Sequence, residues 1–117
     1  MKSNAVEQIL LAKIVVKERG KGGLQDLMRQ FFVNRGIPFF DSQSHKRNTN
    51  RPATPDFLCC LRQNSWPHHG IFAGFEAKVD AKPTKAQLKR IREIKASGGI
   101  GEVIYNLRQL RAIIDNV

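Results

Sequence analysis

One segment of the sequence is apolar on both faces of a predicted strand: Ile71-Phe72-Ala73-Gly74-Phe75-Glu76-Ala77-Lys78-Val79. Successive side chains of a strand point to opposite faces, and a strand that is apolar on both is typical of the middle of a covered sheet. Glu76 and Lys78 lie on the same face of this strand. Charged side chains are costly in such a place unless they are paired or bind a ligand.

A second strand is predicted just upstream, over residues 56–62. The intervening residues 64–70 have turn composition, so the two strands are expected to form a hairpin. A hairpin places Asp56, at the start of one strand, close to Glu76 and Lys78 near the end of the other. Two neighbouring carboxylates repel each other unless a cation lies between them, and Mg²⁺ prefers such oxygen ligands.

This geometry predicts a site that hydrolyses a phosphodiester. A divalent cation between Asp56 and Glu76 would acidify a water molecule, and Lys78 is placed to orient or deprotonate it. The alternative is that Asp56 belongs to an ordinary turn after Pro55 and that the Glu-x-Lys pattern is surface charge. The same pattern recurs at residues 93–95, in a predicted helix, where surface charge is expected.

The remaining elements are predicted from hydrophobic periodicity and from capping and turn residues. Helices are expected over residues 4–19, 24–34, 84–97 and 108–116, and further strands over residues 37–40 and 102–107. The whole chain, residues 1–117, is then one α/β domain with the element order ααβββαβα. It consists of a mixed four-stranded sheet flanked by helices.

The composition favours a polyanionic partner. Lys and Arg number 20 against 10 Asp and Glu, so the 117-residue chain has a formal net charge of +10. Such an excess on a small domain is typical of nucleic-acid binding, although a basic surface without a partner is the simpler alternative. The longest apolar run, residues 57–61, is far shorter than the roughly 20 residues of a membrane-spanning helix, so no membrane role is expected.

Two basic groups are candidates for phosphate contacts. One lies in the polar segment 41–54, and the other lies on the outer stripe of the helix after Pro83. Together they comprise Lys46, Arg47, Arg51, Lys82, Lys85, Lys89 and Arg92. The alternative for the helix stripe is an ordinary solvated face. On the opposite stripe, Gln87 either supports the site at Glu76 or closes a capping box with Thr84.

The chain resembles a known nuclease superfamily. Pro55-Asp56, followed by Glu76-Ala77-Lys78 in an apolar strand, is similar to the PD-(D/E)XK nuclease signature. The segment that begins the next helix, Pro83 to Leu88, is similar to the VRR-NUC branch, the virus-type replication-repair nucleases. The helix end at Gly98-Gly99 and the strand after it also fit this branch. The resemblance covers about residues 24–114.

The resemblance implies a restriction-endonuclease-like core and a Mg²⁺- or Mn²⁺-dependent DNA endonuclease. Asp56, Glu76 and the backbone carbonyl of Ala77 would hold the metal. Lys78 would act on the attacking water, and Gln87 would complete the catalytic set. Stand-alone relatives of this size are similar to phage proteins that work as homodimers in the cytoplasm of a bacterial host. They act on branched or flapped DNA such as Holliday junctions, in DNA repair.

The chain departs from the family at one position. Many members carry a glutamate in the first core helix, where this chain has Leu24, Gln25 and Asp26. Glu7, on the upstream helix, is the candidate for the additional acidic residue. Gln25 stands at a recurring glutamine of the family and is a candidate polar site residue. The alternative function is a non-catalytic basic DNA- or RNA-binding module that retains the nuclease fold.

Overall fold

The computed structural model describes residues 4–42 and 53–117. Its elements, in chain order, are α1 (Ala5–Ala12), α2 (Leu24–Arg35), β1 (Phe39–Asp41), β2 (Phe57–Arg62), β3 (Gly70–Ala77), α3 (Lys85–Ala96), β4 (Ile100–Ile104) and α4 (Leu107–Asp115). The strands form one mixed sheet in the order β1-β2-β3-β4, in which only the pair β3–β4 is parallel. The expected α/β fold with a mixed four-stranded sheet and four flanking helices is therefore confirmed.

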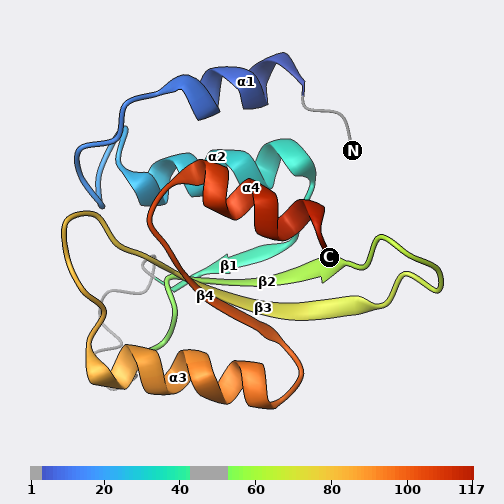
Figure 1. The fold of residues 1–117 in the computed structure, drawn as a ribbon. Helices are drawn as coiled ribbons and strands as arrows, with labels where there is room; N and C mark the ends of the chain where they lie inside the picture. The colour runs from blue at the N-terminus through green and yellow to red at the C-terminus, as the bar shows by residue number, and fades with distance from the viewer. Residues whose placement is uncertain (1–3, 43–52) are drawn as a thin grey trace.

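Helices cover both faces of the sheet (Figure 1). α2 and α4 lie on one face, and α1 packs over these two helices on the side away from the sheet. α3 lies on the other face, against β3 and β4. The N-terminal ends of α2 and α3 and the C-terminal end of β3 all lie at the left of Figure 1. This shared end of the molecule holds the candidate site.

The main core lies between the sheet and the helices α2 and α4. Phe57 and Phe75 point to this side and are fully buried against Phe32, with ring centroids 5.4 and 6.2 Å from it. On the other face, α3 approaches β3 closely because β3 has Gly74 at the contact. A Cβ at that position would come within 2.7 Å of Ile94 Cδ1. This close packing fixes α3 beside β3, so that the first turn of the helix lies near the end of the strand.

The helices are short, at 8 to 12 residues. α1 ends at Ala12, whereas the sequence pattern predicts a helix to about Arg19. The next residues, 14–16, are Ile-Val-Val, and consecutive β-branched side chains disfavour a helix. Within the described ranges, no helix is both long and apolar enough to cross a membrane.

β4 lies slightly upstream of its predicted position and ends at Ile104. Its register is set by the parallel pairing with β3, which matches Ile104 to Ala77. The side chain of Asn106 then accepts a hydrogen bond from the backbone N–H of Gln109 and begins α4. Because this cap lies two residues after Ile104, it excludes the longer strand that the apolar pattern predicts.

Candidate active site

The hairpin brings Asp56 and Glu76 together, as the sequence pattern predicts. Its register pairs Phe57 with Phe75, so Asp56 follows opposite Glu76. The backbone N–H of Ala77 donates to Asp56 Oδ2 at 2.9 Å. Both carboxyl groups are almost completely buried, at 2% and 3% exposure. The first residue before β2 and the penultimate residue of β3 thus form a buried pair of acidic groups.

The electrostatics of this pair centre on Glu76. Burial, which disfavours the charged form, is the main cause that raises the pKa of Glu76 to about 8. The charge of Asp56 and a hydrogen bond with its side chain raise that pKa further, and Lys78 lowers it. The Lys78 Nζ lies 4.0 Å from Glu76 Oε2. One nearby lysine therefore compensates only part of the negative charge of two buried carboxylates.

Gln87 has both of the roles that the sequence left open. Its Nε2 donates to Glu76 Oε2 at 3.2 Å. Its Oε1 accepts from the backbone N–H of Thr84 at 2.9 Å, while Thr84 Oγ1 accepts from the backbone N–H of Gln87 at 3.1 Å. The capping box and the contact with Glu76 therefore coexist, because the amide uses its oxygen for the cap and its nitrogen for the carboxylate. The start of α3 fixes the orientation of Glu76.

Glu18 is an acidic neighbour of the site that the sequence analysis missed. Its negative charge also raises the pKa of Glu76. The backbone N–H of Gln25 donates to the Glu18 carbonyl oxygen at 2.9 Å. Within a continuous helix this N–H would donate to the carbonyl oxygen of the residue four positions upstream. Glu18 therefore lies beside the N-terminal end of α2. The turn at Gly20–Gly23 makes this possible and was the available signal, but a helix predicted through residue 19 concealed it.

Gln25 lies in the first turn of α2, at the same end of the molecule as the acidic pair, and is 2% exposed. Its Nε2 has no hydrogen-bond partner among the residues that the structure describes. A buried amide nitrogen without a partner is unfavourable and is typical of a functional position or of an unseen ligand. Gln25 therefore remains a candidate site residue, although its side chain makes no direct hydrogen bond to Asp56 or Glu76.

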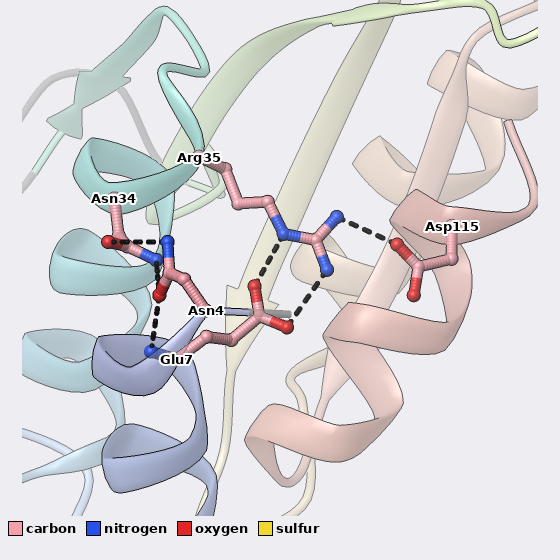
Figure 2. Close-up of polar contacts among 5 residues, drawn as sticks. All are labelled: Asn4, Glu7, Asn34, Arg35 and Asp115. Carbon is pink, nitrogen blue, oxygen red and sulfur yellow. Dashed lines mark hydrogen bonds and ion pairs between the residues drawn. The ribbon is translucent and has the colours of Figure 1, made fainter. Parts of the chain in front are cut away.

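Glu7 does not join the site, which corrects its prediction as the additional acidic residue. Its carboxylate binds Arg35, with Oε1 2.5 Å from Nε and Oε2 3.1 Å from Nη2, and Arg35 Nη1 binds Asp115 at 2.7 Å (Figure 2). Arg35 is the last residue of α2, at the opposite end of that helix from Gln25. Glu7 therefore links α1, α2 and α4, with its charge neutralised by a guanidinium.

The basic residues fall into two groups. Those on and before α3 are exposed, as either a phosphate-binding or a solvated surface requires: Lys82, Lys85, Lys89 and Arg92. Those in the polar segment lie outside the described residues: Lys46, Arg47 and Arg51. Exposure alone does not separate the two interpretations of the helix stripe, which stays a prediction.

The acidic pair is the candidate for metal binding among the described residues. In residues 4–42 and 53–117, no group of three or more His, Cys, Asp or Glu side chains is close enough to hold a metal ion. Asp56 and Glu76 nevertheless offer the oxygen ligands that Mg²⁺ and Mn²⁺ take, and these ions often use only one or two carboxylates.

Comparison with protein-family models, with curated proteins and with solved structures finds no match to this chain.

Proposed function

We propose that the chain is a metal-dependent DNA endonuclease of the VRR-NUC type. The observation that carries this proposal is the buried pair Asp56 and Glu76, with Lys78 Nζ 4.0 Å from Glu76. Burial, and after it the neighbouring carboxyl group of Asp56, disfavour the charged form of Glu76 and raise its pKa. A divalent cation between the two groups would stabilise their charged forms beyond what Lys78 and Gln87 provide.

The residues divide the chemical tasks. Asp56, Glu76 and the backbone carbonyl of Ala77 would hold Mg²⁺ or Mn²⁺, which when bound neutralises charge on the phosphodiester and acidifies water. Lys78 orients the attacking water and stabilises the negative charge that develops on the phosphate. Gln87 holds Glu76 in a fixed orientation through its 3.2 Å hydrogen bond.

Glu18 is the third acidic group in this proposal, in place of Glu7. It lies at the N-terminal end of α2 and its charge acts on Glu76. A nearby carboxylate increases the attraction of the site for a cation without binding the cation directly. The resemblance to the family, which carries a glutamate at the start of this helix, supports the same assignment.

DNA is the proposed partner, and the net charge of +10 supports a polyanion. By the resemblance, the substrate is branched or flapped DNA, and a homodimer supplies the two active centres that two incisions need. A phage-encoded protein that acts in the bacterial cytoplasm fits this proposal.

The second candidate is a non-catalytic DNA- or RNA-binding module with the same fold. It is favoured by the small number of grouped acidic side chains, since the described residues contain no cluster of three. This candidate predicts that binding is sensitive to salt and that no metal supports strand cleavage. It also predicts that loss of Glu76 leaves the binding affinity unchanged.

The deciding experiment incubates labelled linear, flapped and four-way DNA with the protein in EDTA, Mg²⁺, Mn²⁺ or Ca²⁺. Cleavage that leaves 5′-phosphates is expected with Mg²⁺ and Mn²⁺ and is absent in EDTA. Ca²⁺ is expected to support binding without cleavage, because it coordinates oxygen at longer distance and acidifies water less. Cleavage that persists in EDTA would contradict the metal-dependent mechanism, and binding without cleavage under every condition would favour the second candidate.

A further inference from the structure

A groove of about 400 Å³ lies between α3 and β3, away from the carboxylate pair. Its walls combine an aromatic ring, a guanidinium and a carboxylate over an apolar floor: Phe72, Arg90, Glu93, Ile94, Ser97 and Gly99. Phe72 is 51% exposed, although it occupies the third position of a strand that becomes fully buried further along. A large aromatic side chain beside an open groove is suited to contact with a flat ligand.

This groove and the candidate active site lie on the same face of β3. Even-numbered side chains of β3 point to the face that α3 covers, so Phe72 and Glu76 share that face. Four residues of strand separate them by about 13 Å. α3 runs back alongside β3, from Gln87 near the site to Ser97 at the groove (Figure 1). A chain that leaves the site along α3 therefore reaches Phe72 within a few nucleotides.

Arg90, on the wall of the groove, is available to bind a phosphate. Arg90 Nη1 lies 3.5 Å from Glu93 Oε1, and both side chains are 52% exposed. Such an exposed ion pair contributes little, so a phosphate can replace the carboxylate as the partner of Arg90. The net charge of +10 favours a polyanion such as DNA as the occupant of this groove.

We propose that this groove binds the single-stranded DNA next to the cleaved phosphate, with a base stacked on Phe72 and a phosphate on Arg90. Stacking on an aromatic side chain accepts any base, as a structure-selective nuclease requires. The proposal rests on the proposed function, since it assigns the substrate class of the same site: DNA with an unpaired arm.

The experiment measures fluorescence anisotropy of two labelled DNA probes in EDTA, without any cleavage readout. One probe is a blunt duplex, and the other is the same duplex with a single-stranded arm of about ten nucleotides, enough to cover the groove. The wild-type protein is expected to bind the armed probe about tenfold more tightly. Phe72→Leu, which keeps an apolar side chain but removes the ring, is expected to lose this gain and to keep its affinity for the duplex.

Two controls sharpen the test. Trp66→Leu removes an aromatic side chain that is 83% exposed but does not line the groove, so it is expected to keep the gain from the arm. Glu93→Gln removes the competing carboxylate and is expected to strengthen binding of the armed probe, whereas Arg90→Gln weakens it.

Equal affinity of the wild-type protein for both probes, or equal losses in Phe72→Leu and Trp66→Leu, would overturn the proposal. So would dissociation of a dimer in Phe72→Leu with unchanged arm binding, because the groove would then accommodate a second copy. Failure of the wild-type protein to cleave with Mn²⁺ would refute the nuclease instead, and the anisotropy result would still decide the groove.

Discussion

Glu7 and Glu76 are both buried glutamates, at 1% and 3% exposure, but their surroundings differ. Glu7 accepts two hydrogen bonds from Arg35, a side chain that also binds Asp115 (Figure 2). The hydrogen bond to Glu7 is the main cause that raises the pKa of Arg35, so the guanidinium stays charged. Glu76 has a second carboxyl group beside it and a single lysine at 4.0 Å.

The difference separates a structural carboxylate from one that is available for chemistry. The buried charge of Glu7 is compensated by two hydrogen bonds from the Arg35 guanidinium. Removal of the Glu7 charge would leave Arg35 only partly compensated. Glu76 has a raised pKa although it accepts a hydrogen bond from Gln87 and lies near Lys78, and a strongly raised pKa is typical of functional sites. Burial alone would have assigned the two glutamates the same role.

The largest expected effect is on cleavage by the Glu76→Gln variant. The amide keeps the size of the side chain but removes the carboxylate that is proposed to hold the metal, so the rate is expected to fall on the order of a thousandfold or more. Glu7→Gln is the matched change at the other glutamate and is expected to stay within a few-fold of wild type. Initial rates on flapped DNA with Mn²⁺ measure both variants at a temperature where they are folded. Comparable losses in the two variants would remove the distinction between the glutamates.

The next largest effect is on stability, and here Glu7→Gln is expected to have the larger effect of the two variants. Glu7→Gln leaves Arg35 buried with half of its anionic partners, and the loss of one partner of a buried pair costs about 3–5 kcal/mol. Urea denaturation should therefore show a marked drop in the free energy of unfolding for Glu7→Gln and little or no drop for Glu76→Gln. A Glu7→Gln protein as stable as the wild type would show that the Arg35 network is not a stabilising element.

The pH dependence of stability isolates Glu76. Its pKa of about 8 in the folded protein exceeds its ordinary value of 4.5, so the folded state binds this proton more tightly than the unfolded state does. The resulting stabilisation is complete below about pH 4.5 and is lost as the pH rises to about 8. In EDTA, the wild-type protein should lose on the order of 3 kcal/mol between pH 5 and pH 8 relative to Glu76→Gln. Parallel pH profiles of the two proteins would contradict the raised pKa.

The smallest effect concerns Glu18. Glu18→Gln is expected to weaken Mn²⁺ binding about tenfold, because it removes a charge that acts on the site from nearby. The control is Asp26→Asn on the same helix, whose carboxylate binds the backbone N–H of Gly22 and the amide of Gln30. Mn²⁺ titrations of both variants give the comparison. Equal affinities in the two variants would exclude Glu18 from the site.

The hairpin and the acidic pair could be predicted because local sequence determines them. The apolar pattern of residues 71–79 specifies a covered strand, and the turn before it sets the register that brings Asp56 to Glu76. Gln87 could be placed from its position in the first turn of a helix, since both of its hydrogen bonds follow from that position.

The partners of Glu7 and the position of Glu18 could not be predicted, because contacts distant in sequence determine them. Arg35 lies 28 residues from Glu7, and Asp115 lies 80 residues from Arg35, with no pattern that links them. Glu18 reaches the start of α2 only because the chain turns back after α1 and Gln25 donates to its carbonyl oxygen. A helical pattern read through this turn places Glu18 on the wrong element.

A cation site at Asp56 and Glu76 is tested by calorimetric titration of the protein with Mn²⁺ at pH 7, in two buffers with different heats of ionisation. Because Glu76 has a pKa of about 8, it is mostly protonated at pH 7 before a cation arrives. We expect the wild-type protein and Glu7→Gln to bind Mn²⁺ and to release about one proton per ion, and Glu76→Gln to lose this binding. Equal Mn²⁺ affinity in wild type and Glu76→Gln, or no binding by the wild-type protein, would contradict a cation site at Asp56 and Glu76.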